Sequence, residues 1–471
     1  MGQQFGVIGL AVMGENIALN VERNGFPIAV FNRTTAKTQA FAEGRAAGKK
    51  VVAAHTLAEL VQALDRPRKI LVMVKAGSAV DDMIRNILPL LEEGDILIDG
   101  GNSNYRDTDR RIRSLEGSGI RYVGMGISGG EEGALKGPSI MPGGDPEAYR
   151  ILEPILTTIS AKTNSGPCVA YMGAGSAGHF VKMCHNGIEY GDMQLISEVY
   201  DILRNGLNLT PKEIAGIFSE WNRGELQSFL VEITAKIADF PDDQKSGDVL
   251  VDRILDTAGQ KGTGKWTTEA ALDLGVPVPT ITASVDARLM SDRKEERVHA
   301  SEIYPEPSKS SLPDRKEAVK NIRSALYASK ICSYAQGFAL LHEASKAYGY
   351  GLRYGEIARI WKGGCIIRAI FLDRIRQAFA SQPELPNLLL DSMFQIDINS
   401  RLDAWRWAVT LAVKMGLAVP GMSASLAYFD SYRRERLPAN LIQAQRDYFG
   451  AHTYRRTDRD GVFHTQWIPP E

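Results

Sequence analysis

The spacing of apolar residues changes once along the chain, from short strand-like runs to the three- and four-residue spacing of helices. In about the first 170 residues, short apolar runs typical of buried strands occur at 5–10, 27–32, 70–74, 96–99 and 121–124. Stretches of helical or polar character separate these runs, for example Val80–Leu91 and Asp107–Leu115. Short apolar strands that alternate with helices predict a doubly wound α/β domain with a parallel sheet.

From Ser176 onward the spacing becomes helical. Apolar residues recur every three or four positions in 176–205, 211–220, 224–238, 248–258 and 318–348. The segment 295–315 is rich in Pro, Ser and charge, and we expect it to be an exposed connection. The pattern therefore predicts an α/β domain over 1–176, a large all-α domain over 177–436 and a C-terminal tail over 437–471.

A glycine-rich turn joins the first predicted strand to the first predicted helix. It reads Gly-Leu-Ala-Val-Met-Gly, a variant of the dinucleotide-binding sequence with Ala11 at the middle position. Such a turn lets the backbone approach a pyrophosphate at a helix N-terminus. This makes the first domain Rossmann-type, although a turn without a ligand would look the same. The candidate cofactor residues here are Gly9, Leu10, Ala11, Val12, Met13 and Gly14.

The end of the second strand indicates which dinucleotide is bound. Asn32, Arg33 and Thr34 stand where NAD-binding domains usually carry an acidic residue for the ribose hydroxyls. A guanidinium there can pair with a ribose 2′-phosphate, which favours NADP. The alternative is a solvated arginine.

Three other segments follow predicted strands and are expected to line the same crevice. They are 75–78, 100–103 and 127–131. The Asn102 amide can donate and accept hydrogen bonds, while Ser128 and the amides that follow it could hold a carboxylate. Simple turns are the alternative. These segments add Val74, Lys75, Ala76 and Asn102 to the cofactor candidates, and Asn102, Ser128, Gly129 and Gly130 to the substrate candidates.

The helix predicted after Ser176 carries a row of ionisable side chains. Lys182, Asn186 and Glu189 are spaced i, i+4 and i+7, which places them on one helix face. Val181, Cys184 and Ile188 form the complementary stripe and can pack, so the polar row would sit on a rigid element. We interpret the row as catalytic, with a solvated Lys–Glu face as the alternative.

Two later segments could bind phosphate. Gly259–Lys265 matches the first seven positions of a P-loop, but Trp266 replaces the Ser or Thr that would hold magnesium, and no strand precedes it. We reject a triphosphatase and keep Lys261 and Thr263 as phosphate candidates. The polar tail could dock on a second subunit and give it Arg446 and His452, although a frayed terminus is the alternative.

Composition narrows the functional class. A formal charge of −1 gives no reason to expect nucleic acid or an anionic membrane as a partner. Four scattered cysteines without a C-x-x-C pair argue against a disulfide framework and a thiolate metal site. We see no signal peptide and no apolar run long enough to span a membrane, so a cytoplasmic protein without a bound metal is expected.

Taken together, these motifs resemble the decarboxylating 6-phosphogluconate dehydrogenase family over essentially the whole chain. The most specific are Lys182–Tyr190 and Asp256–Trp266, and Trp361–Arg368 agrees with them. The glycine-rich turn is shared with many β-hydroxyacid dehydrogenases. Ala11 belongs to this family's own variant of the turn.

The resemblance implies a metal-independent homodimer that oxidises 6-phospho-D-gluconate with NADP to D-ribulose 5-phosphate, carbon dioxide and NADPH, in the pentose phosphate pathway. It implies that Lys182 is the base and Glu189 the acid. The sugar acid would be bound by Asn102, Ser128, Gly129, Gly130, His185 and Asn186. The phosphate would be bound by Tyr190, Lys261, Thr263 and Arg288, with Arg446 and His452 from the partner chain.

The chemistry of these side chains agrees with that reaction. A neutral Lys182 could remove the C3 hydroxyl proton and, once protonated, stabilise the enolate formed as carbon dioxide leaves. Glu189, held neutral, could protonate C1 of the product. Two alternatives remain, namely an NADP-dependent β-hydroxyacid dehydrogenase acting on another sugar acid and a non-catalytic NADP-binding protein.

Overall fold

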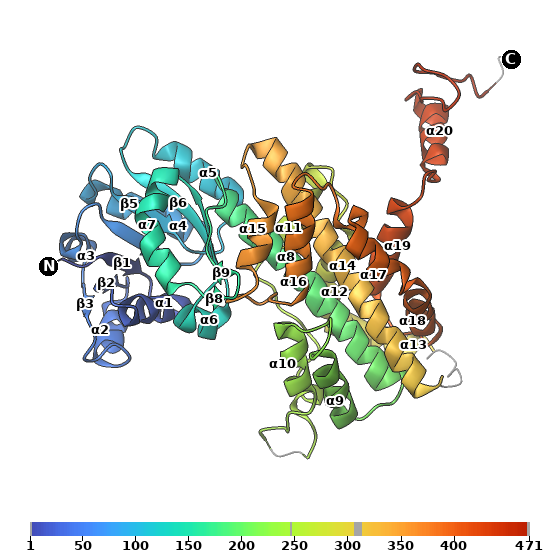
Figure 1. The fold of residues 1–471 in the computed structure, drawn as a ribbon, viewed down its shortest axis with the longest axis horizontal. Coiled ribbons are helices and arrows are strands. Elements are labelled where there is room, and N and C mark those ends of the chain that lie inside the picture. Colours follow the sequence, from blue (N-terminus) through green and yellow to red (C-terminus); the bar gives the residue numbers. More distant parts are fainter. Residues whose placement is uncertain (1, 245–246, 306–312, 469–471) are drawn as a thin grey trace. The chain divides into compact units, whose positions relative to one another are not determined.

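The computed structural model describes residues 2–244, 247–305 and 313–468. Figure 1 shows its helices and strands. The chain divides into two compact units, Met1–Ser425 and Leu426–Glu471, and the division falls within helix α19 (Pro420–Tyr432). The predicted limits at 176/177 and 436/437 stay predictions.

The α/β part of the first unit contains a seven-stranded sheet in the order β3-β2-β1-β4-β5-β6-β7. All neighbours are parallel except β7, which runs antiparallel to β6. The strands are β1 (Phe5–Ile8), β2 (Ile28–Phe31), β3 (Val51–Ala53), β4 (Lys69–Val72), β5 (Ile96–Asp99), β6 (Arg121–Ile127) and β7 (Ile140–Gly144). A separate two-stranded pair is formed by β8 (Lys162–Thr163) and β9 (Gly166–Pro167).

Helices cover both faces of this sheet because successive strand side chains point to opposite sides. Val7 of β1 packs with Ile17 and Leu152 in one core, whereas its neighbour Ile8 packs with Leu60 in the other. The doubly wound prediction is therefore confirmed. The helices are α1 (Val12–Arg23), α2 (Thr35–Glu43), α3 (Leu57–Ala63), α4 (Ser78–Ile87), α5 (Tyr105–Ser114), α6 (Gly130–Lys136) and α7 (Pro146–Ile159), with a 3-10 turn η1 (Leu88–Leu90).

The helical part that follows is built around two long helices, α8 (Ala177–Asp201) and α14 (Arg315–Tyr348), which pack together. A π-helical turn, η2 (Ile202–Gly206), continues α8. The predicted all-α character is confirmed. The other helices are α9 (Pro211–Trp221), α10 (Phe229–Ala238), α11 (Thr263–Asp273), α12 (Pro279–Ser291), α13 (Lys294–Ile303), α15 (Tyr354–Ile360), α16 (Phe371–Ser381), α17 (Ser392–Asn399), α18 (Leu402–Lys414) and α20 (Ala439–Gly450), with short turns η3 (Leu250–Asp252) and η4 (Leu388–Leu390).

Helix α8 begins directly against the edge of the sheet. A Cβ at Gly178 would lie 2.2 Å from the carbonyl oxygen of Gly124 in β6 and 2.4 Å from that of Met141 in β7. Only a glycine permits this approach of helix and strand backbones. The α8 side chains that follow are therefore held at a fixed distance from β6.

Several sequence-based boundaries are wrong. The helix predicted at 248–258 is only the turn η3 (Leu250–Asp252). Its apolar side chains Ile254 and Leu255 are more than half exposed, so they do not form a buried face that would stabilise a helix. The presumed connection at 295–315 begins as helix α13, and its residues 306–312 lie outside the described part of the chain. The antiparallel strand β7 was not predicted.

Two further predictions concern the cysteines and the membrane. The four cysteines are all free and buried. Within the described ranges, no helix combines the length and apolarity needed to cross a membrane.

The close contact at Gly178 gives a stability prediction. Gly178→Ala should lower the free energy of unfolding by about 1–3 kcal/mol, since the added methyl group must displace two strand carbonyls. Urea denaturation measures this. Gly216 of α9 is the matched control, because nothing lies within 4 Å of where its Cβ would be and alanine is the better helix former there. Equal behaviour of Gly178→Ala and Gly216→Ala would contradict the packing argument.

Candidate active site

Lys182, Asn186 and Glu189 lie on one face of α8, as their spacing predicts. The Lys182 side chain is 6% exposed, and its stem lies against β6, where a Cβ at Gly126 would come within 2.4 Å of the Lys182 Cβ. The Lys182 Nζ donates a hydrogen bond of 2.7 Å to the Asn186 Oδ1. The amine is thus removed from bulk water and held by the Asn186 amide oxygen, with the His185 Nδ1 3.4 Å away.

His185 joins this row to the segment that follows β6. Its Nδ1 lies 3.1 Å from the Asn186 Oδ1 and 3.6 Å from a Glu189 carboxylate oxygen, and its Nε2 lies 3.3 Å from the Ser128 Oγ. Both imidazole nitrogens have a hydrogen-bond partner when Nδ1–H donates to the Asn186 Oδ1 and Nε2 accepts from the Ser128 hydroxyl. The imidazole packs edge-on against Trp361, with ring centroids 5.5 Å apart. His185 therefore links four predicted site residues in one network.

Burial shifts the pKa values of Lys182, His185 and Glu189 towards their uncharged forms. Burial lowers the pKa of the Lys182 ammonium, and the Glu189 carboxylate opposes this only in part. Burial raises the pKa of the Glu189 carboxyl, against the nearby cations Lys182 and Arg288. Burial, and then the charge of Lys182, lower the pKa of His185 well below its ordinary value. A neutral amine beside a neutral acid is the state that suits a base and an acid acting in turn.

A second cluster lies one turn further along α8. The Arg288 guanidinium of α12 stacks 3.5 Å from the centroid of the Tyr190 ring and donates to the Gly259 carbonyl oxygen at 3.4 Å. Gly264 lies flat against the same ring, since a Cβ there would come within 2.4 Å of it. The loop that carries Lys261 and Thr263 is thereby brought to Tyr190 and Arg288. Lys261 is exposed and Thr263 is buried at the start of α11.

The segments after β5 and β6 are held by their own contacts. The Asp99 carboxylate accepts hydrogen bonds from the Gly101 amide at 3.1 Å and the Ser103 hydroxyl at 2.6 Å, which fixes the loop bearing the exposed Asn102. Gly129 has a φ of +112° and Gly130 one of +62°. These conformations favour glycine and turn the chain so that α6 begins directly after Ser128.

The predicted cofactor residues gather around a separate cavity of about 330 Å³ at the carboxyl ends of β1, β2 and β4. Of these residues, the cavity is lined by Gly9, Leu10, Ala11, Asn32, Arg33, Thr34, Val74 and Lys75. Gly9 has a φ of +100°, and a Cβ on Gly14 would lie 1.9 Å from the Gly9 carbonyl oxygen, so both glycines are needed for the tight turn. The remaining predicted residues, Val12, Met13, Gly14, Ala76 and Asn102, do not line it.

Arg33 is available to a ligand in this cavity. Its side chain is exposed at the rim beside Thr34 and Lys37, and within the described residues no carboxylate pairs with it. Asn32 instead supports the turn, because its Oδ1 accepts a hydrogen bond of 3.1 Å from the Leu10 amide. These side chains suit an anionic group next to a ribose.

Comparison with known proteins agrees with this geometry. The sequence profile described as the NAD binding domain of 6-phosphogluconate dehydrogenase matches residues 4–173, and the profile of the C-terminal domain of the same enzyme matches residues 178–467. The chain belongs to the 6-phosphogluconate dehydrogenase family. The resemblance inferred from the sequence motifs is therefore confirmed.

Individual members of the 6-phosphogluconate dehydrogenase family are similar over almost their whole length. The decarboxylating enzyme of Synechococcus elongatus is 58% identical over 468 residues, and the NADP(+)-dependent, decarboxylating enzyme of Bacillus subtilis is 58% identical over 467 residues, with 99% of both chains covered in each case. A structure of Plasmodium falciparum 6-phosphogluconate dehydrogenase, from work on the apo form and complexes with NADP+ and 6-phosphogluconate, is 47% identical with a TM-score of 0.95. It covers 98% of this chain and 100% of that one.

Sequence reasoning missed the residues that fix α8 against the sheet. The His179 Nε2 lies 3.1 Å from the Asp99 carbonyl oxygen and its Nδ1 lies 2.7 Å from the Thr108 hydroxyl, so this buried imidazole connects α8, β5 and α5. Its position three residues before Lys182 is the one available signal. A lone histidine in an apolar stretch is more often a packed side chain, and no pattern in the sequence identifies its partners.

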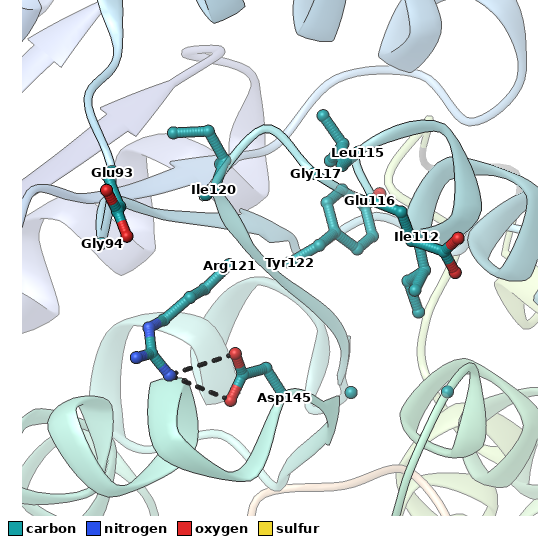
Figure 2. Close-up of a pocket in the computed structure, with 13 residues that line it drawn as sticks. Glu93, Gly94, Ile112, Leu115, Glu116, Gly117, Ile120, Arg121, Tyr122 and Asp145 are labelled. Atoms are coloured by element: carbon teal, nitrogen blue, oxygen red, sulfur yellow. Dashed lines mark hydrogen bonds and ion pairs between the residues drawn. The ribbon is translucent and has the colours of Figure 1, made fainter.

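Another hollow, of about 640 Å³, is not part of this site. Figure 2 shows it beside the starts of β5 and β6, the opposite ends of the strands from those that carry the cofactor candidates. Its arginine, Arg121, is already paired with Asp145 at 3.2 Å, and Glu93 and Glu116 add negative charge. It contains none of the predicted site residues, so volume alone does not locate the active site here.

Arg446 and His452 belong to the C-terminal unit, where both are exposed. Their contribution to a substrate site stays a prediction.

The exposed guanidinium at the cavity rim gives a prediction for this family member. Arg33→Gln should weaken NADP binding by about 10- to 100-fold, the loss expected for a charge-assisted hydrogen bond to phosphate, and should leave NAD binding nearly unchanged. Isothermal titration calorimetry with NADP and with NAD measures both affinities. Arg150→Gln is the control, because Arg150 is an exposed arginine of the same domain that pairs with Glu147. An equal loss of affinity for NADP and NAD would contradict the assignment of Arg33 to the ribose 2′-phosphate.

Proposed function

We propose that this chain catalyses the oxidative decarboxylation of 6-phospho-D-gluconate to D-ribulose 5-phosphate and carbon dioxide, with NADP reduced to NADPH. The observation that carries the proposal is the buried Lys182 amine, held by Asn186 on the same helix face as Glu189. An uncharged amine and an uncharged acid in one row are the two proton-transfer groups that this reaction needs. Family membership supports the same reaction.

The cavity at the ends of β1, β2 and β4 fits NADP. The tight Gly9 turn lets the first turn of α1 face a pyrophosphate, and Arg33 and Thr34 offer donors to a ribose phosphate. Bound NADP supplies a hydride acceptor for C3 of the sugar acid.

Lys182 is the general base in this proposal. Oxidation at C3 breaks the C3–H bond and leaves a ketone only if the hydroxyl proton is also removed, and a neutral amine can take that proton. The lowered pKa of Lys182 raises the fraction of molecules in which the amine is neutral. Asn186 fixes the position of the amine through its Oδ1.

The protonated Lys182 then serves the second step. The new C3 ketone is β to the carboxylate, so carbon dioxide can leave with its bonding electrons passing into an enolate. The Lys182 ammonium, in a site largely closed to water, stabilises the developing oxygen anion. The same side chain thus acts on both steps at one substrate atom, the C3 oxygen.

Glu189 is the acid that completes the reaction. The enediol must gain a proton at C1 of ribulose 5-phosphate, which requires the carboxyl in its neutral form. The raised pKa of Glu189 increases that fraction. Its side chain is 20% exposed, so it can exchange the lost proton with water after each turnover.

The substrate is placed by contacts on either side of this row. Ser128 and the amides of Gly129 and Gly130 would hold the carboxylate, and the side chains of Asn102, His185 and Asn186 would bind hydroxyls. The phosphate would be bound by Tyr190, Lys261, Thr263 and Arg288. The cluster of Arg288, Tyr190 and the loop at 259–264 favours a phosphorylated substrate over a plain β-hydroxy acid. A non-catalytic NADP-binding protein would have no use for a buried, amide-bonded lysine.

We also propose that the protein is a cytoplasmic homodimer. In it, the tail after 436 gives Arg446 and His452 to the phosphate site of the partner chain. Exposed apolar side chains on α20 support docking of this unit on another surface, among them Leu441 and Phe449, which are 61% and 73% exposed.

The experiment that tests the proposed function combines an assay with one substitution. With 6-phosphogluconate and NADP, the wild-type protein should release one carbon dioxide per NADPH, and gluconate should be a much poorer substrate. Lys182→Met should reduce turnover by at least about 10³-fold, because it removes the proposed acceptor of the hydroxyl proton, and should leave NADP binding unchanged.

Lys236→Met is the control for the loss of a lysine charge, since Lys236 is exposed and pairs with Glu232 on the same helix. It should turn over at the wild-type rate. Substantial residual activity in Lys182→Met would remove Lys182 from the mechanism, and NADPH formation without carbon dioxide would contradict the decarboxylation.

A further inference from the structure

Among the described residues of the C-terminal unit, 426–468, one carboxylate is completely buried. Asp447 lies near the end of α20, and its side chain is 0% exposed although most of its neighbours on the helix are exposed. Its Oδ1 accepts from the Thr453 amide at 2.9 Å and lies 2.9 Å from the His464 Nδ1. Its Oδ2 accepts from the Thr465 amide at 3.0 Å and the Trp467 Nε1 at 2.8 Å. Four groups from three places in the tail thus converge on one side chain.

These hydrogen bonds control the charge of Asp447. Burial by itself would raise the pKa of this carboxyl, but the bonds from His464, Thr465 and Trp467 hold it well below its ordinary range. The carboxylate form is therefore the one that satisfies all four donors.

The turn beside Asp447 has an unusual backbone. Ala451 and Thr453 have φ values of +48° and +62°, which residues other than glycine rarely adopt. His452 lies between them. Such a turn persists only when its surroundings hold it. Here the Ala451 amide donates to the Asp447 carbonyl oxygen at 3.0 Å, and the Thr453 amide donates to the Asp447 carboxylate.

A glutamine connects this turn to Arg446. The Gln443 Nε2 donates to the Thr453 carbonyl oxygen at 2.6 Å, and the Gln443 Oε1 accepts from the Arg446 Nη1 at 3.1 Å. The His452 ring packs edge-on near Phe449, with centroids 6.0 Å apart. Arg446 and His452 are thus set relative to each other within the tail itself.

We propose that Asp447 is a positioning residue that orders the strained turn of His452, and through it Arg446, into a phosphate-binding arrangement before the tail meets a substrate site. The proposal rests on the proposed function, in which the tail supplies these two side chains. It adds that the arrangement is made inside the tail and does not have to form on the partner chain. Substrate binding then carries no entropic cost for ordering the turn.

The test is Asp447→Asn in the full-length protein. An asparagine has one acceptor oxygen and an NH2 group that would face two of the four donors, so the turn should lose its order. We expect the KM for 6-phosphogluconate to rise about 10-fold or more, with kcat and the KM for NADP within about twofold of wild type. The mass measured by light scattering should equal that of wild type.

The control is Asp458→Asn, which removes an exposed carboxylate of the same unit that is bonded to Arg456. It should leave all parameters unchanged. His452→Ala is the reference for the tail's own role and should raise the KM for 6-phosphogluconate. If His452→Ala raises this KM and Asp447→Asn does not, the positioning role is overturned and the proposed function stands. If His452→Ala leaves the KM unchanged, the proposed contribution of the tail fails, and the positioning role fails with it.

A purely structural role would give a different result. It would lower kcat per protein as the folded fraction falls, with the KM for 6-phosphogluconate unchanged, and this outcome overturns the proposal. If Asp447→Asn does not fold, Trp467→Phe removes one of the four donors and keeps the ring. That variant should raise the KM about threefold at an unchanged kcat, and an unchanged KM would overturn the proposal.

Discussion

The burial of one lysine amine is the constraint on which the site depends. An ammonium ion in a water-poor interior is costly, so it either finds a carboxylate at close range or loses its proton. Lys182 has an amide oxygen at 2.7 Å as its short-range partner, whereas a carboxylate would have stabilised the charge. The site thus leaves the amine able to accept a proton. A second buried lysine, Lys330 of α14, instead lies against the Asp192 carboxylate.

The close approach of backbones makes this burial possible. Gly178 brings the start of α8 onto the backbones of β6 and β7, and Gly126 leaves room for the Lys182 stem beside β6. Further along the helix, Gly187 admits the Thr267 side chain of α11, whose hydroxyl donates to the Met183 carbonyl oxygen at 2.9 Å. The positions of Lys182 and Glu189 therefore follow from packed backbone, which has little freedom to adjust.

The sequence allowed the row on α8 and the α/β layers to be predicted, because both follow from a simple period. Spacing alone put Lys182, Asn186 and Glu189 on one face, and the glycine-rich turn and Arg33 line one cavity, as the sequence suggested. The contacts of His179 with Asp99 and Thr108 could not be predicted, since they join residues about 70 to 80 positions apart. The helix predicted at 248–258 failed for a related reason, because periodicity does not say whether a partner surface exists. The roles assigned to individual site residues stay predictions.

The measurement that tests the central claim most directly is the titration of the Lys182 amine itself. Lysine labelled with ¹³C at Cε can be followed by NMR across pH in the full-length protein, and the Lys182 signal assigned by its absence in Lys182→Met. The account predicts a pKa below the ordinary value of about 10.4, so that the signal changes from the charged to the neutral form at lower pH than those of exposed lysines. A Lys182 that titrates together with the exposed lysines, or above them, would contradict it.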